Sequence, residues 1–248
     1  MAERHKQEIQ QEQVRREGVV ADRGLRAHML KVYNYMASGV LLTGIVALLT
    51  YSSSTLTNLL YQMQGGYIVG YTGLGWVALL SPLAFVLLMS FGKNKMKPAT
   101  LQAMFWGFAA VMGLSLSSIF FMYVGMSIAK IFFITAATFG ALSFWGYTTK
   151  KDISGWGAFL LMGLMGVIIA SVVNWFLVSP MMDFVISIIG VLVFAGLTAY
   201  DTQKIKNMYY TYSDGTMAKK GAIMGALHLY LDFINMFLFL LRLFGNRN

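Results

Sequence analysis

The chain contains no cysteine, which excludes disulfide bonds, thiolate nucleophiles and cysteine-based metal sites. Charge is also scarce, because only 12% of the 248 residues are Asp, Glu, Lys or Arg. A soluble domain usually carries about 25% charged residues, and half that share cannot build a polar surface. Hydrophobic residues make up 57% of the chain. This composition indicates an integral membrane protein, with the lipid bilayer as its main partner.

Acidic residues are the rarer of the two charged classes, with 10 Asp and Glu against 19 Lys and Arg, for a formal net charge of +9. In a nucleic-acid-binding protein such an excess would form one folded patch. Here the basic residues lie in an N-terminal tail and in short segments between apolar stretches. We therefore expect no nucleic-acid partner and interpret the excess as a signal of membrane topology.

Seven apolar stretches follow a polar tail at residues 1–30, which lacks the apolar core of a signal peptide. Each has about 20 residues, enough for a helix to cross a hydrocarbon core of about 30 Å. The predicted fold is an all-α membrane protein, with a charged cytoplasmic tail at 1–30 and a seven-helix transmembrane domain at 31–248. The stretches cover residues 32–51, 71–91, 101–124, 127–147, 156–178, 182–205 and 221–244.

The basic residues also predict an orientation. Sixteen of the 19 lie before the first stretch or in the alternate loops that share its side of the membrane. The opposite side has three, Lys130, Arg242 and Arg247. Because positive residues are retained in the cytoplasm, the N-terminus is predicted to be cytoplasmic and the C-terminus to lie outside.

Apart from Asp183, which lies beside the loop at the very start of the sixth stretch, two acidic residues interrupt the apolar stretches, Asp201 in the sixth and Asp232 in the seventh. Ionised acids at membrane depth are costly and normally face a polar interior or each other, so this pair is the candidate functional site. The alternatives are that Asp201 lies near the cytoplasmic interface and that Asp232 is a structural hydrogen-bonding group. At helical rise Asp232 lies deeper than Asp201, so contact requires the sixth helix to continue towards Tyr209 or the seventh to begin lower.

Polar residues accompany the two acids at helical spacing. His228 and Asn235 lie one turn before and after Asp232, and Thr198 lies near Asp201. Two carboxylates in contact cannot both ionise easily, so they would share a proton and titrate as a unit. His228 either tunes that protonation or simply forms a hydrogen bond. The pair would also bind Ca²⁺ through oxygen, but only weakly and transiently, as permeation requires.

Two runs of sequence carry a family resemblance, FAGLTAYDTQKIK at residues 194–206 and HLYLDFINMFLFLLRLFG at residues 228–245. They resemble the bacterial branch of the transmembrane Bax inhibitor motif family. The resemblance implies six helices around a central seventh, location in a bacterial inner membrane, and a pH-sensitive Ca²⁺ leak governed by two aspartates that map to Asp201 and Asp232. Some members place a basic residue in the second helix, whereas residues 71–91 contain no charge.

The sequence favours passive, proton-sensitive cation conduction, and three other functions remain as alternatives. The same resemblance allows a stress-protective regulatory protein that modulates a membrane protease or another membrane partner without conducting ions. An intramembrane aspartyl protease is disfavoured, because Leu229, Tyr230 and Leu231 precede Asp232 where that class has a GxGD pattern. A retinal protein is disfavoured because the seventh stretch has no lysine for a Schiff base. We expect no enzyme activity and no cofactor, with Ca²⁺ only as a permeant ion.

Overall fold

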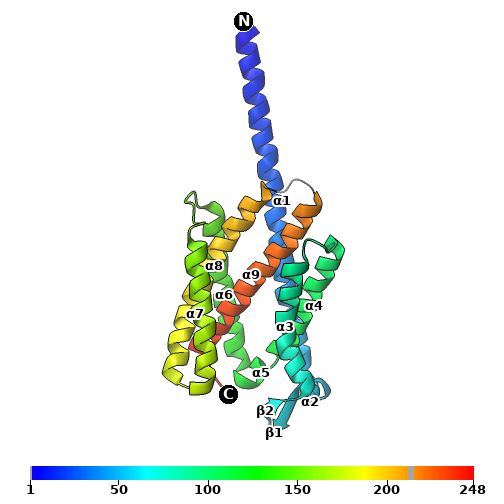
Figure 1. Cartoon of the computed structure of the whole chain (residues 1–248), viewed down its shortest axis with the longest axis vertical. Helices are drawn as coiled ribbons and strands as arrows, with labels where there is room; N and C mark the ends of the chain where they lie inside the picture. Colours follow the sequence, from blue (N-terminus) through cyan, green and yellow to red (C-terminus); the bar gives the residue numbers. More distant parts are fainter. Residues whose placement is uncertain (1, 212–214) are drawn as a thin grey trace.

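The computed structural model describes the backbone of residues 2–211 and 215–248, and the side chains of residues 23–211 and 215–248. Within these residues, seven helical spans are long and apolar enough to cross a membrane, which confirms the predicted all-α, seven-helix class. Figure 1 shows them as one bundle. The long helices are α1 (Ala2–Ser52), α3 (Gly73–Gly92), α4 (Pro98–Leu116), α6 (Gly125–Thr148), α7 (Trp156–Leu177), α8 (Pro180–Tyr209) and α9 (Gly215–Phe244).

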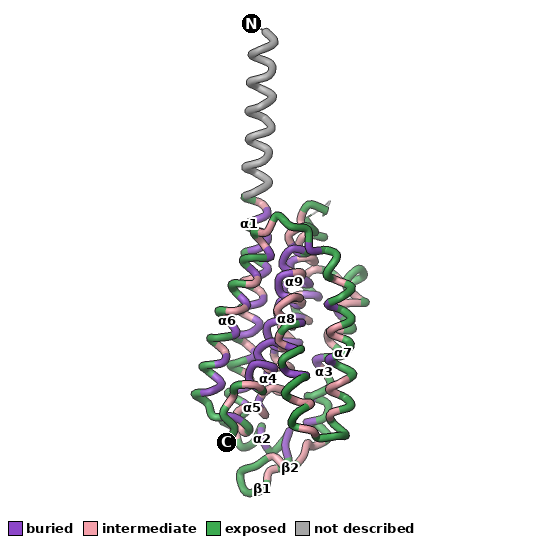
Figure 2. Tube along the Cα trace, turned by 90° about the vertical axis from the view of Figure 1, so that its left-hand side faces the viewer, coloured by how far each residue is buried: buried purple, intermediate pink, exposed green. Residues whose placement is uncertain are grey.

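Helix α9 occupies the centre of the bundle. In its most apolar window 72% of the residues are buried, against 11% in α7. It packs on α8, α1, α6 and α4, while α3 lies against α4 and α7 against α8. Figure 1 shows α9 running obliquely through the bundle, and Figure 2 shows buried positions along its length. The expectation of a central seventh helix is therefore confirmed.

The ends of the helices are set by local chemistry. Pro98 and Pro180 stand in the first turns of α4 and α8, where the missing N–H costs no hydrogen bond. The Ser179 hydroxyl accepts a hydrogen bond from the backbone N–H of Met182, which caps the start of α8. The Thr72 hydroxyl caps α3 in the same way, by accepting from the N–H of Gly75.

Helix α1 extends well before the first predicted stretch. Its apolar span begins at Arg23, and Leu25 and Met29 are already buried in the core. Packing therefore begins before the predicted boundary at residue 30. The side chains of the earlier part of the tail lie outside the described residues. Helices α8 and α9 also extend past the apolar stretches, to Tyr209 and back to Gly215.

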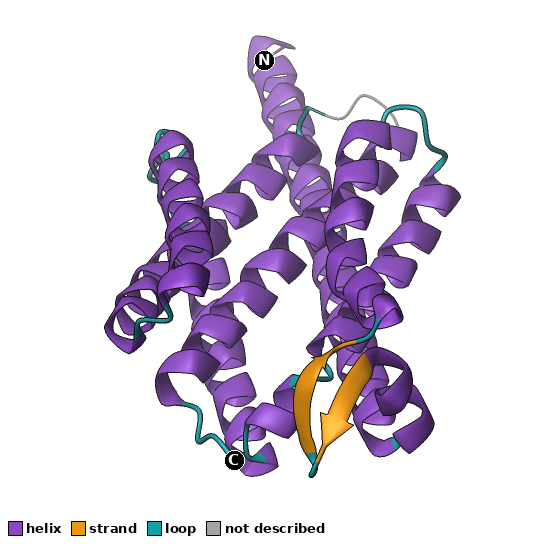
Figure 3. Ribbon diagram, turned by 60° about the horizontal axis from the view of Figure 1, so that its bottom comes forward, coloured by secondary structure: helices purple, strands orange, loops and turns teal. Residues whose placement is uncertain are grey.

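A small β-hairpin lies where α1 ends, and the apolar pattern did not predict it. After α2 (Ser54–Leu60), strands β1 (Tyr61–Gln64) and β2 (Tyr67–Tyr71) pair antiparallel, as Figure 3 shows. Gly65 and Gly66 form the turn with φ of 57° and 87°, values that glycine adopts readily. The buried Tyr61 hydroxyl lies 2.7 Å from the Ser117 hydroxyl, so the hairpin is tied to the end of α4. A short helix, α5 (Ile119–Met122), follows that end.

The two ends of the bundle are distinct. Helix α1 begins at the end where α8 finishes and α9 starts, and α9 finishes at the opposite end, as an odd number of spans requires (Figure 1). At that second end Arg242 of α9 lies 3.7 Å from Asp183 of α8. This ion pair gives Arg242 a local partner. Which end faces the cytoplasm stays a prediction.

Candidate functional site

The register between α8 and α9 decides which polar groups can meet. A side chain on Gly190 would collide with the Phe239 ring, and one on Gly225 would press on Ile205, so the two helices lie very close. Small residues permit such close approach in membranes. In this antiparallel register His228 lies opposite Asp201, and Asp232 lies opposite Thr198, about one turn deeper. The extension of α8 to Tyr209, on which the depth argument depended, is present.

Asp232 is the more deeply buried of the two aspartates. It is 4% exposed, and its Oδ2 atom has no hydrogen-bond partner among the described residues. Asp201 is half-buried and close enough for its carboxylate to interact electrostatically with that of Asp232. A buried carboxyl oxygen without a partner is unfavourable in a low-dielectric interior. The arrangement therefore concentrates two acids in a space that tolerates little negative charge.

Basic groups lie beside Asp201 and beside its neighbour His228. His228 and Lys204 both interact electrostatically with Asp201, and Lys93 interacts electrostatically with His228. Lys93 follows directly after the end of α3. Although residues 71–91 are uncharged, the end of the second spanning helix therefore brings a positive charge to the site. Sequence reasoning named His228 but missed Lys93 and Lys204, because their proximity depends on helix register.

Thr198 and Asn235, the other predicted neighbours, bond within their own helices. The Thr198 hydroxyl donates to the carbonyl oxygen of Phe194 at 2.7 Å, and the Asn235 amide donates to that of Leu231 at 2.8 Å. Both bonds satisfy polar groups that would otherwise be unpaired in apolar surroundings, as expected for structural groups in membrane helices. Thr198 is fully buried at the position of α8 opposite Asp232.

A chain of hydroxyl groups reaches this region from α1. Tyr33 lies 2.7 Å from Ser143 of α6, and Ser143 lies 2.8 Å from Thr202 of α8. Thr202 donates its only hydroxyl hydrogen to the carbonyl of Thr198, so Ser143 must donate to Thr202 and Tyr33 to Ser143. The chain links three helices and ends beside Asp201. The sequence shows these hydroxyls, but nothing in it pairs them.

The site offers few side chains that could bind a metal ion. Within the described residues there is no group of three or more His, Cys, Asp or Glu side chains that could hold a metal ion. Asp201 and Asp232 together offer carboxylate oxygens, which hard cations prefer, but too few for a cage of six or more oxygens. The geometry suits a brief encounter with a cation better than its storage.

Known proteins resemble this chain over nearly its whole length. Residues 25–248 match the family described as inhibitor of apoptosis-promoting Bax1. An uncharacterised protein of Rickettsia prowazekii is 47% identical over 91% of this chain and 92% of its own length. The inner membrane protein YbhL of Escherichia coli is 44% identical over 90% of this chain and 93% of its own length. The resemblance carried by residues 194–206 and 228–245 is thus confirmed, and the chain belongs to the Bax inhibitor family of multi-pass membrane proteins.

Proposed function

We propose that this protein conducts cations passively across a membrane, Ca²⁺ among them, and that Asp201 and Asp232 make the leak depend on pH. The observation that carries the proposal is the buried carboxyl group of Asp232, with one oxygen unpartnered among the described residues, beside the carboxylate of Asp201. By its relation to the Escherichia coli protein, we further propose that it resides in a bacterial inner membrane.

The physical basis is competition for a proton. Two carboxyl groups in a low-dielectric space cannot both ionise easily, so the pair holds a proton over a range of pH and titrates as one unit. The basic groups beside the pair are His228 on α9 and Lys204 on α8, which interact with Asp201, and Lys93 beyond α3 interacts with His228. Their charges oppose the negative charge of the pair, and protonation of His228 adds to that opposition.

The link from protonation to conduction lies in the packing of α8 on α9. The acids belong to the most extensively packed helix pair in the bundle, and at Gly190 and Gly225 an added side chain would press on the opposite helix. A change in the charge of the pair alters the cost of keeping α8 and α9 together in an apolar interior. When the two carboxylates are exposed to water, their oxygens would attract a hard cation without holding it.

Calcium flux from reconstituted liposomes, measured from about pH 5 to about pH 8, the range in which His also titrates, tests the proposal. Asp232→Asn removes the competing acid, so its flux should become independent of pH. Whether the constant flux matches the acidic or the alkaline limit of the unmodified protein identifies the conducting state. Asp183→Asn is the matched control, since it neutralises an aspartate of α8 far from the pair and should keep the pH response.

Two results would overturn the proposal. One is an Asp232→Asn protein that retains the full pH response. The other is Ca²⁺ flux through the unmodified protein that does not exceed the flux of protein-free liposomes at any pH. The second result would favour the regulatory alternative, in which the membrane domain binds a partner and forms no pathway.

A further inference from the structure

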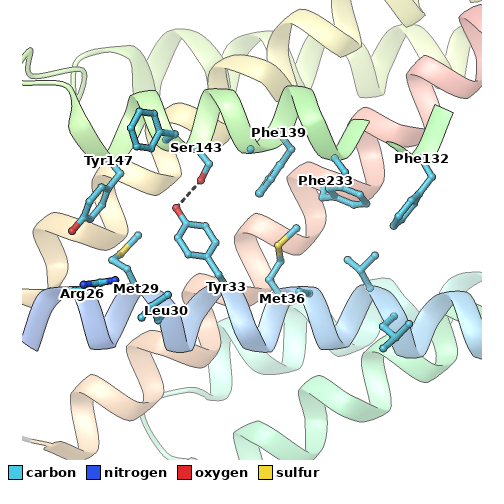
Figure 4. A pocket seen from close by; sticks show the side chains of 16 residues that line it. Arg26, Met29, Leu30, Tyr33, Met36, Phe132, Phe139, Ser143, Tyr147 and Phe233 are labelled. Carbon is cyan, nitrogen blue, oxygen red and sulfur yellow. Dashed lines mark hydrogen bonds between the residues drawn. The ribbon is translucent and has the colours of Figure 1, made fainter. Parts of the chain in front are cut away.

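A long groove of about 620 Å³ lies between α1 and α6, away from the α8–α9 contact. Its side walls are the facing surfaces of these two helices, and Phe233 of α9 closes its floor, as Figure 4 shows. The residues that line it are Arg26, Met29, Leu30, Tyr33, Met36, Ala37, Val40 and Leu41 from α1, and Phe132, Ala136, Phe139, Gly140, Ser143, Phe144 and Tyr147 from α6.

The interior of the groove is apolar although two hydroxyl groups belong to its lining. Tyr33 donates to Ser143, and Ser143 donates to Thr202 on the far side, so both hydroxyls are satisfied within the protein. What remains for a ligand is carbon and sulfur surface from Met29, Met36 and Phe139. Hydrocarbon fits such a surface, whereas a polar ligand would lose its hydrogen bonds to water without replacement.

Charge is confined to one end of the groove. Among the described lining residues, Arg26 is the only charged one, and Figure 4 places it beside Tyr147 at the end opposite Phe132. A second cation lies nearby, because the ammonium group of Lys206 donates to the Tyr147 carbonyl at 2.8 Å and stands over the Tyr147 ring. This is the end of the bundle that the lysine-rich loops predict to be cytoplasmic.

The length of the groove matches one leaflet of a bilayer. Arg26 to Leu41 on α1 and Phe132 to Tyr147 on α6 each correspond to about 22 Å of helix. A leaflet contributes about 15 Å of hydrocarbon, and the headgroup layer adds several ångströms. A groove of this length, apolar throughout and positive at one end, has the dimensions and polarity of a single phospholipid.

We propose that the α1–α6 groove binds one anionic phospholipid of the cytoplasmic leaflet. Its phosphate lies at Arg26, with Lys206 adding positive potential, and one acyl chain runs between Tyr33 and Phe132. Basic pockets between membrane helices on the cytoplasmic side are known to select anionic headgroups. A second copy of the chain is a poorer occupant, because it would bring no negative charge to Arg26 from an apolar helix face.

Native mass spectrometry of the purified protein with phosphatidylglycerol or phosphatidylethanolamine of identical acyl chains tests the site. The unmodified protein should bind phosphatidylglycerol about fivefold more strongly, the factor expected for one cation near an anionic lipid surface. Arg26→Gln should abolish this preference. Arg23→Gln, one turn earlier on α1 and outside the lining of the groove, should keep it.

A second pair of variants tests the acyl-chain part of the site. An added Cβ at Gly140 or at Gly166 would meet nothing within 4 Å, so a side chain can begin at either position without a clash at its first carbon. Gly140→Leu fills the groove and should remove both lipids. Gly166→Leu places the same side chain on the lipid-facing surface of α7 and should remove neither.

Three results would overturn the proposal: full headgroup preference in Arg26→Gln, undiminished binding in Gly140→Leu, or a dimer that Gly140→Leu dissociates. A photoreactive group at the acyl end of phosphatidylglycerol gives a test without substitutions. It should label peptides of α1 and α6 in the unmodified protein, and labelling confined to other helices would refute the assignment.

Discussion

The hydroxyl groups of Thr43 on α1 and Tyr230 on α9 lie 2.7 Å apart in the buried centre of the bundle. Thr43 uses its single hydroxyl hydrogen to donate to the carbonyl oxygen of Ala109 on α4, at 2.7 Å. Tyr230 is therefore the donor to Thr43. One pair of hydroxyls thus connects three helices, and Tyr230 also packs edge-on against Phe108 with ring centroids 5.1 Å apart.

The direction of that hydrogen bond predicts unequal effects of two near-isosteric substitutions. Tyr230→Phe removes the donor and leaves Thr43 bonded to Ala109, so unfolding should become easier by only about 0.6 kcal/mol. Thr43→Val leaves a buried phenol without an acceptor and should cost about 1–3 kcal/mol. Reversible unfolding in mixed micelles measures both values. A larger cost for Tyr230→Phe than for Thr43→Val would contradict the assigned direction.

Gly146 is predicted to be a second sensitive position. A Cβ there would overlap the backbone carbonyl of Ala199, two residues before Asp201, so Gly146→Ala must push α6 away from α8. We expect a loss of about 1–3 kcal/mol, the usual cost of overpacking. Gly140→Ala is the control in the same helix, because that site is open and alanine favours a helix by up to about 1 kcal/mol. Equal stabilities of the two variants would show that α6 and α8 are not in backbone contact.

The N-terminal tail is predicted to be dispensable for folding and flux. Deletion of residues 1–22 leaves in place Leu25, the first buried residue among those whose side chains the structure describes, so thermal stability and calcium flux should be retained. Deletion of residues 1–33 also removes Leu25, Met29 and Val32 from the core and should prevent folding. If the regulatory alternative holds, the shorter deletion should lose a membrane partner in a pull-down. Loss of flux after the shorter deletion would contradict the prediction.

Membrane orientation is checked with reporter fusions in a bacterial host. Since the Lys and Arg residues are concentrated on one side, alkaline phosphatase fused after Asn248 should be active and green fluorescent protein there should stay dark. A fluorescent protein placed before the first residue should be bright. The reverse pattern would show that the orientation is opposite to the predicted one and that the Arg26 end of the groove lies in the outer leaflet.

Hydropathy predicted the seven spans because lipid requires each to be both apolar and helical. It underestimated three helix ends, near Arg23, Tyr209 and Gly215, where the helix continues through charged residues. A lysine-rich turn such as that of Lys204 and Lys206 lowers hydropathy without breaking a helix. The predicted boundaries therefore mark the ends of the apolar segments, and the helices continue beyond them.

The hairpin of β1 and β2 was missed although its signal is present. Gly65 and Gly66 separate two short runs that contain Tyr61, Tyr67 and Tyr71, and a Gly-Gly pair in that setting favours a two-residue turn. The segment lies between two strong apolar stretches and is itself only weakly patterned. A prediction of membrane-spanning segments alone therefore does not detect the hairpin.

The aspartate pair was found in the sequence because charge is rare and costly inside apolar stretches. Its surroundings were not, since they depend on how helices pack. Gly190 and Gly225 fix the register that brings His228 to Asp201, and hydroxyl partners such as Ser143 and Thr202 are 59 residues apart in sequence. No local pattern records a contact of that kind.

The central place of α9 has a consequence for biogenesis. The helix around which the others are arranged is translated after all six of them, from Gly215 onward. Until it leaves the ribosome, the surfaces of α1, α4, α6 and α8 that will contact it have no counterpart within the nascent chain. Insertion must therefore hold a partly assembled ring in the bilayer, and the final tertiary structure can form only when the seventh span arrives.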